Sequence, residues 1–196
     1  MDIRKYFKIN NSNIGIDSNV EIDSNIKIEN DVKDIIVYTD GSAINNGKKN
    51  CYGGIGIFFG DNDPRNVSEK LTSVKSSNNV AELTACLKAI EIIINGNYNN
   101  NKIVICTDSE YLIKCINIWS YSWEKNNWQR NVKGKNKPIK NLDIIKKIKS
   151  YSDKYKIIFK HIRSHKMEPI NKNSLEYRDW YGNNMADKLA RKGADK

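Results

Sequence analysis

Two strand-like segments of this chain end on the same short motif, and this repetition constrains the fold more than any other feature. Residues 34–43 read DIIVYTDGSA, in which a β-branched and aromatic run is followed by Thr39 and Asp40. Residues 101–107 read NKIVICT and lead directly into Asp108. Each run is typical of a buried strand, although Asp-Gly alone is an ordinary turn signal. Because functional groups collect where adjacent strands of an α/β sheet end, the two aspartates are expected to lie close together.

The pattern around these segments predicts a mixed α/β domain over residues 34–196. Five strands are expected near residues 34–39, 52–59, 66–74, 101–107 and 154–162. Four helices are expected near residues 79–95, 109–118, 141–150 and 183–194. Three early strands followed by strands that alternate with helices indicate one mixed sheet with helices packed on it.

Composition limits the class of protein. The chain of 196 residues carries a net charge of +10, which favours a polyanionic partner such as nucleic acid, although a general bias toward Lys and Asn would also produce it. The four cysteines form no Cys-x-x-Cys pair and three lie in apolar runs, so an intracellular, reducing compartment is expected, with nucleus or cytoplasm left open. No apolar stretch approaches the ~20 residues of a membrane span. We therefore expect a monomer without a membrane partner.

The first 33 residues differ from the rest of the chain. Residues 9–33 are polar and rich in Asn, which favours a linker or tail, although their weak alternation would also fit an extra edge strand. Within residues 1–8, Ile3, Tyr6 and Phe7 have the i, i+3, i+4 spacing of one helical face. This segment resembles the sliding-clamp-binding peptide of replication proteins, and a tail that packs its aromatics on the domain would show the same spacing.

Two further carboxylates stand among apolar helix positions. Glu82 lies in the first turn of the helix expected near residues 79–95, and Asp187 lies between apolar residues of the last helix. An unpaired charge is costly to bury, although a helix start would also suit Glu82 and plain exposure would suit Asp187. Four acidic residues in one sheet indicate a common site, where close aspartates raise each other's pKa unless a cation lies between them.

The order of these motifs resembles the catalytic domain of type 1 ribonuclease H. Thr-Asp-Gly-Ser, Asn-Asn-x-x-Glu-Leu, Thr-Asp-Ser and Asn-x-x-Ala-Asp-x-Leu-Ala follow one another over about residues 34–194. The resemblance implies a mixed five-stranded sheet, three antiparallel strands and then parallel ones, with helices on both faces. It implies an endonuclease that cuts RNA in RNA/DNA hybrids and leaves 5′-phosphate and 3′-hydroxyl ends. Its biological role is left open among primer removal, genome replication and the clearing of hybrids from transcription.

The resemblance also implies two Mg²⁺ ions, with Mn²⁺ as a substitute, because hard oxygen ligands suit Mg²⁺ and two such ions clamp a scissile phosphate. Their expected ligands are Asp40, Glu82, Asp108 and Asp187. His165 follows the last strand, where the family places a histidine that aids proton transfer or product departure. It precedes Asp187 by 22 positions (187 − 165), about twice the family's interval. The insert over residues 166–182 is expected to form a lid or a substrate contact, for which three residues are suited: Tyr177, Arg178 and Trp180.

Residues 119–141 are basic and rich in Trp, and they resemble the family's protrusion that holds the DNA strand. We call this segment the protrusion. Basic residues contact phosphates, aromatic rings line a backbone groove, and amides suit the RNA 2′-hydroxyl, although the tryptophans would equally pack on the core. The expected nucleic-acid contacts are Asn46, Asn78, Asn79, Trp119, Trp123, Trp128, Lys137, Asn141 and Asn183.

Two other functions fit parts of the pattern. A hybrid-binding module without catalysis would lack a reason to keep all four carboxylates, and a DNA nuclease or resolvase of related fold would need another carboxylate order.

Glu110 occupies a place where the family often has an uncharged residue, so it would either weaken phosphate contacts or add a metal ligand. His161 is assigned to the last strand as a structural residue.

Overall fold

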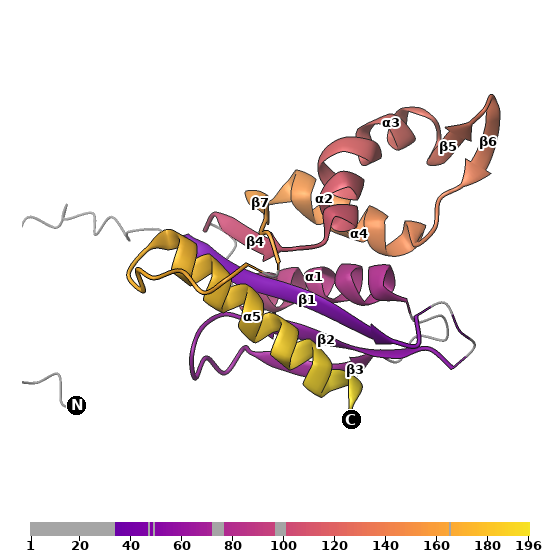
Figure 1. The fold of residues 1–196 in the computed structure, drawn as a ribbon. Helices are drawn as coiled ribbons and strands as arrows, with labels where there is room; N and C mark the ends of the chain where they lie inside the picture. The colour runs from indigo at the N-terminus through magenta and orange to yellow at the C-terminus, as the bar shows by residue number, and fades with distance from the viewer. Residues whose placement is uncertain (1–33, 47, 49, 72–76, 97–100, 165) are drawn as a thin grey trace, which may run out of the picture. The chain divides into compact units, whose positions relative to one another are not determined.

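Five strands form one mixed sheet in the order β3-β2-β1-β4-β7 (Figure 1). They are β1 (Ile35–Ile44), β2 (Tyr52–Phe58), β3 (Val67–Leu71), β4 (Ile103–Thr107) and β7 (Ile157–His161). The β1–β2 and β2–β3 pairs are antiparallel, whereas the β1–β4 and β4–β7 pairs are parallel. The expected sheet of three antiparallel strands followed by parallel ones is therefore confirmed.

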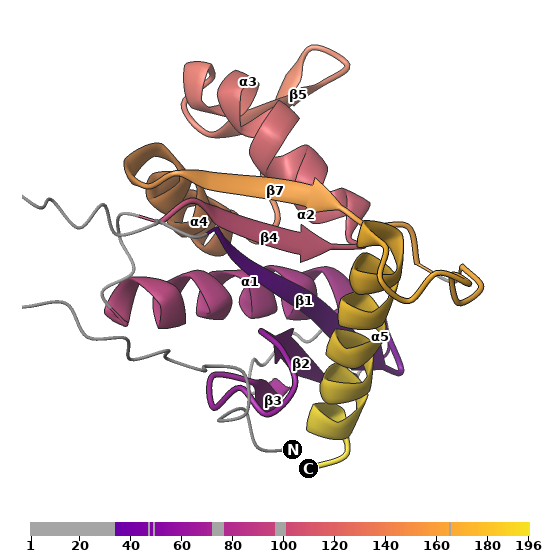
Figure 2. The same ribbon diagram turned by 90° about the vertical axis from the view of Figure 1, so that its left-hand side faces the viewer.

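Helices cover both faces of this sheet (Figure 2). The described residues form α1 (Asn78–Asn95), α2 (Glu110–Lys114), the π-helical turn η2 (Cys115–Trp119), α3 (Ser120–Lys125), which lies in the protrusion, α4 (Leu142–Lys154) and α5 (Leu175–Ala194). Successive strand residues point to opposite faces. Val37 of β1 therefore belongs to the core under α1, α2 and α4, whereas Tyr38 belongs to the core under α5. The expected helices on both faces are confirmed.

Helix α5 rests directly on the backbone of β2. A Cβ atom at Gly56 would lie 2.0 Å from the carbonyl oxygen of Ala186, and one at Gly54 would lie 2.2 Å from the amide nitrogen of Ala194. Only glycine permits so close an approach of helix and strand. The contact determines where Asp187, on the same helix, lies relative to the sheet.

The computed structural model describes residues 34–46, 48, 50–71, 77–96, 101–164 and 166–196. The chain divides into the units Met1–Asp31 and Val32–Lys196, and the described residues belong to the second. The expectations for residues 1–8 and 9–33, including Ile3, Tyr6 and Phe7, lie outside them, as does His165. Within the described ranges, no helix has both the length and the apolar character needed to cross a membrane.

Several boundaries differ from those expected. Helix α5 begins at Leu175 rather than at residue 183, because Ser174 caps it by accepting a hydrogen bond from the Tyr177 amide at 3.0 Å. The helix expected near residues 109–118 continues through η2 into α3 and reaches Lys125. Beyond α3, the protrusion also contains an unexpected hairpin of β5 (Gln129–Val132) and β6 (Lys135–Pro138).

Candidate active site

Asp40 does not end a strand, because β1 continues through it to Ile44 and pairs Asp40 with Gly56 of β2. The reading of Asp-Gly as a turn is therefore wrong. Gly41 instead allows α1 to approach β1 closely, since a Cβ atom there would lie only 2.2 Å from the amide nitrogen of Glu82. This missing side chain lets α1 lie against β1 at Ala81 and Glu82 and places Glu82 beside Asp40.

Asp108 lies in the short link between β4 and α2, where several hydrogen bonds hold the backbone. Thr107 Oγ1 accepts a hydrogen bond from the Ser109 amide at 3.1 Å, and Ser109 Oγ caps α2 through the Leu112 amide at 3.3 Å. The side-chain amide of Asn183 on α5 donates to Asp108 Oδ2 at 3.4 Å. Asp108 is thus fixed by β4, α2 and α5 together.

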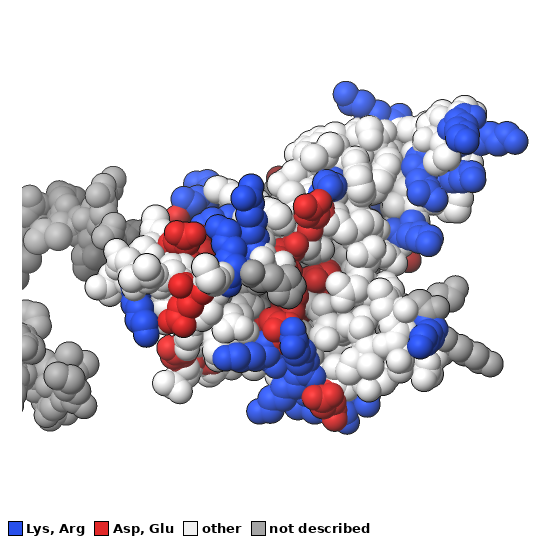
Figure 3. Space-filling view, viewed as in Figure 1, with Lys and Arg blue, Asp and Glu red and all other residues white. Residues whose placement is uncertain are grey.

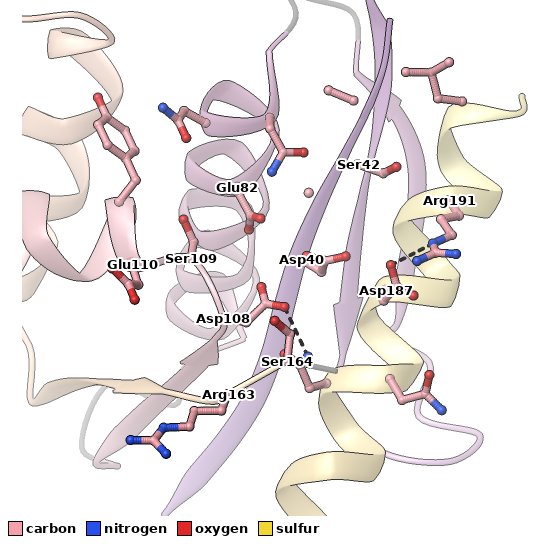
Figure 4. A pocket seen from close by; sticks show the side chains of 18 of the residues that line it. Asp40, Ser42, Glu82, Asp108, Ser109, Glu110, Arg163, Ser164, Asp187 and Arg191 are labelled. Atoms are coloured by element: carbon pink, nitrogen blue, oxygen red, sulfur yellow. Dashed lines mark hydrogen bonds and ion pairs between the residues drawn. The ribbon is translucent and has the colours of Figure 1, made fainter. Parts of the chain in front are cut away.

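Three carboxylates converge between these elements. One oxygen each from Asp40, Glu82 and Asp108 lie within 4.8 Å of one another. Figure 4 shows the three side chains pointing toward a common centre. They line a groove of about 1090 Å³, which Asp187 and Glu110 also line. The sequence reading thus named three residues that the fold brings within reach of a shared cation.

The electrostatics of this cluster are unfavourable without a cation. Asp40 is 7% exposed and Glu82 is 4% exposed. Burial, followed by the charges of Asp108 and Asp187, raises the pKa of Asp40 to about 7. Burial, followed by the charges of Asp40 and Asp108, holds the pKa of Glu82 well above its usual range. Glu82 Oε2 is buried without a hydrogen-bond partner among the described residues. Hard, uncompensated oxygen donors of this kind fit a divalent ion such as Mg²⁺.

Asp187 lies in the same groove but outside the group of three. Its side chain is 32% exposed, and Oδ1 accepts a hydrogen bond from Arg191 Nε at 2.8 Å, one helical turn further along α5. Figure 4 shows this pair to the side of Asp40. Its assignment as a fourth metal ligand therefore stays a prediction.

The expected nucleic-acid contacts fall into two groups. Asn78, Asn79 and Asn183 line the groove, and the Asn78 amide also bonds to Asn46 Oδ1 at 3.4 Å. Asn183 is 8% exposed, so its contact with Asp108 is a positioning contact that motif matching missed. The other five residues lie on or beside the protrusion: Trp119, Trp123, Trp128, Lys137 and Asn141.

The tryptophans of the protrusion divide between core and surface. Trp123 and Trp128 pack against the core under α1 and α4, whereas Trp119 is 36% exposed and lies 5.6 Å from Trp123 between ring centroids. Lys137 is exposed on β6, and Asn141 begins α4 in a left-handed conformation with φ of 60°. Core packing of the inner rings thus leaves the basic hairpin and Trp119 facing solvent.

Two residues near Asp108 make further contacts. His161 ends β7, and its ring atom Nε2 lies 3.3 Å from the carbonyl oxygen of Asp108, so it contacts the site as well as the sheet. Glu110 is exposed and pairs with Lys114 at 2.6 Å, one turn along α2. The i, i+4 spacing of Glu110 and Lys114 was readable from the sequence, whereas the reach of His161 depends on the β4–β7 pairing.

Residues 32–195 match the family model described as RNase H. The chain is 35% identical over 159 residues to ribonuclease H of Schizosaccharomyces pombe, across 81% of this chain and 52% of that relative, so it spans about half of that relative's length. It is 32% identical over 161 residues to ribonuclease HI of Rickettsia prowazekii, across 82% of this chain and 91% of that relative. A foamy viral protease-reverse transcriptase in complex with RNA/DNA hybrid matches with a TM-score of 0.62 and 27% identity, across 81% of this chain and 20% of that one.

Proposed function

The chain belongs to the ribonuclease H family, and we propose that it hydrolyses the RNA strand of RNA/DNA hybrids. The observation that carries the proposal is the meeting of Asp40, Glu82 and Asp108, whose oxygens lie within 4.8 Å of one another in an open groove. The structural match to a reverse transcriptase solved with an RNA/DNA hybrid supports this choice of substrate.

The donor set supports two divalent ions, Mg²⁺ or in its place Mn²⁺, held by Asp40, Glu82 and Asp108 with Asp187 beside them. When bound, the ions supply activation of the attacking water and stabilisation of the leaving 3′-oxygen, which gives 5′-phosphate and 3′-hydroxyl ends. The buried, mutually repelling carboxylates favour divalent cations over the monovalent ions of the solution.

The chain's own residues hold this constellation before any ligand arrives. Gly41 allows Glu82 to stand beside Asp40, and Asn183 orients the Asp108 carboxylate through its amide. We assign proton transfer to His165, which follows β7 in the sequence. Because Glu82 and Asp108 are held by backbone packing and hydrogen bonds, little reorganisation of these two carboxylates is needed when the phosphate arrives.

The surface around the groove supports a duplex with one strand on each side of the carboxylates. Figure 3 shows Lys and Arg side chains on both sides of an acidic strip, with one basic group over the protrusion. The exposed cations of the protrusion are Lys125, Arg130, Lys133, Lys135, Lys137 and Lys140. They suit the phosphates of the DNA strand, and exposed Trp119 suits its sugars and bases. Asn78 and Asn79 line the groove and suit the RNA 2′-hydroxyls.

Cleavage of a labelled RNA/DNA hybrid, beside duplex DNA and duplex RNA, tests this function with and without Mg²⁺. We expect cutting of the hybrid only when Mg²⁺ is present. Asp108→Asn should lower the rate about a thousandfold, since metal-ion charge stabilisation amounts to several kcal/mol. Asp143→Asn, at an exposed carboxylate on α4, is the matched control and should leave the rate unchanged. Binding without cutting would favour a hybrid-binding module, and cutting of duplex DNA would favour a DNA nuclease.

A further inference from the structure

A second basic surface lies on the other side of the carboxylates from the protrusion. Arg163 follows the edge strand β7, Lys166 lies in the insert, and Trp180 lies in the second turn of α5. All three line the active-site groove and also an adjoining hollow of about 360 Å³. We infer that these three residues, the basic wall, form a second nucleic-acid subsite that holds a backbone phosphate of the strand being cut. The inference rests on the proposed hybrid substrate.

The position of the basic wall selects the strand. The inner tryptophans of the protrusion pack with the core under α1 and α4, whereas α5, which carries Trp180, covers the opposite face of the sheet. Figure 4 shows Arg163 beyond Asp108 as seen from Glu82. A duplex whose one strand lies on the protrusion must place its other strand over the carboxylates, so the wall beyond them meets the strand that is cut.

The cations of the wall are available to a phosphate. Arg163 is exposed, and no residue in the described part of the chain forms an ion pair with it. Lys166 Nζ lies 3.3 Å from Glu176 Oε1, but these side chains are 47% and 65% exposed. Such exposed pairs contribute only about 0–1 kcal/mol, so a phosphate readily replaces Glu176 as the partner. The nearby carboxylates repel a polyanion, and cations beside them offset that repulsion.

The wall is held in place without a ligand. Trp180 Nε1 donates a hydrogen bond to the carbonyl oxygen of Lys166 at 3.1 Å, which ties the insert to α5. The preceding residue, Asp179, accepts hydrogen bonds from Tyr38 on β1 at 3.2 Å and from Lys160 on β7 at 2.5 Å. These bonds attach the start of α5 to two strands of the sheet. A site whose backbone is already held in place loses less entropy when it binds.

Of the three insert residues expected to contact substrate, only Trp180 lines the groove. Tyr177 instead stacks on Tyr181 with ring centroids 6.1 Å apart, and Arg178 lines neither hollow. The substrate contact expected of the insert therefore stays a prediction, and in the proposed subsite Arg163 and Lys166 supply the charge.

Binding of a labelled hybrid, measured by fluorescence anisotropy over a range of salt concentrations, tests the basic wall. An Asp108→Asn background keeps the hybrid intact. Arg163→Ala and Lys166→Ala should each weaken binding roughly five- to tenfold at about 0.1 M salt and reduce the salt slope by about 1, as the loss of one phosphate contact does. Lys172→Ala is the matched control, because Lys172 lies in the same insert, pairs with Glu168 at 3.7 Å and lines neither hollow. Equal affinity of all variants, or an equal loss in the control, overturns the proposal.

Neutral methylphosphonate linkages identify the strand. Placed in the RNA strand beside the cut, they should weaken binding by the parent protein but not further weaken binding by Arg163→Ala. If Arg163→Ala instead becomes insensitive to neutral linkages in the DNA strand, the assignment to the cut strand is overturned. If the parent protein cuts hybrids but the Arg163→Ala and Lys166→Ala variants bind normally, the proposed subsite is refuted while the proposed hydrolysis stands. If the parent protein binds hybrids but does not cut them, the proposed hydrolysis is refuted, and the comparison of binding between variants still tests the subsite.

Discussion

Asp40→Asn should stabilise the metal-free protein at pH 8 although it removes a predicted metal ligand. Burial and the neighbouring charges of Asp108 and Asp187 raise the pKa of Asp40 from 3.8 to about 7. The folded protein therefore binds a proton here more tightly than the unfolded chain does. The stabilisation from this proton is complete below about pH 4 and is lost as the pH rises to about 7.

The size of this effect follows from the pKa values. A difference of about 3 in pKa corresponds to about 4 kcal/mol of unfolding free energy at pH 8. Asparagine removes the charge but leaves a buried amide, so the net gain should be about 2–4 kcal/mol. For a domain of this size that is a rise of about 4–16 °C in Tm.

Thermal unfolding followed by circular dichroism in EDTA measures the gain. At pH 5 the gain should shrink, because wild-type Asp40 is then protonated. Mg²⁺ should raise the Tm of the wild-type protein more than that of Asp40→Asn, since we propose that this carboxylate holds the ion in the folded state. Asp143→Asn, at an exposed position, should change Tm little. A variant no more stable than the wild type at pH 8, or a gain that persists at pH 5, refutes the reasoning.

Three further substitutions test contacts around the site. Gly41→Ala should lower unfolding free energy by about 3 kcal/mol or more in urea titrations, because its Cβ would lie 2.2 Å from the Glu82 amide nitrogen; an unchanged midpoint would contradict this packing. Asn183→Ala should lower kcat and Mg²⁺ affinity about 10–100-fold with hybrid affinity unchanged, since the amide orients Asp108; a loss confined to hybrid binding would instead make it a substrate contact. Tyr38→Phe should cost about 1 kcal/mol in thermal unfolding because its hydroxyl donates a hydrogen bond to α5, and no loss would show that this bond contributes nothing.

Helix boundaries and the hairpin show where sequence reasoning stopped short. Ser174 is a common helix-capping residue, so the sequence contained a signal for the start of α5 at Leu175. The start was instead expected at residue 183, where the Asn-x-x-Ala-Asp motif begins, eight residues too late. In the hairpin, Lys133 and Gly134 both have positive φ, and Gly134 is a turn residue that marks this reversal. Both features are local, so a closer reading of caps and turns would have found them.

The sequence by itself determined the five strands, the order of the motifs and the identity of the acidic residues, because apolar periodicity and turn chemistry are local properties of the chain. Only the tertiary structure decided how these residues act. The close approach at Gly41 brings Glu82 to Asp40, and Asp187, paired with Arg191, lies outside the group of three. Burial and distance between carboxylates depend on how the sheet and helices pack, so their pKa values and their capacity to share a cation exist only in the folded protein.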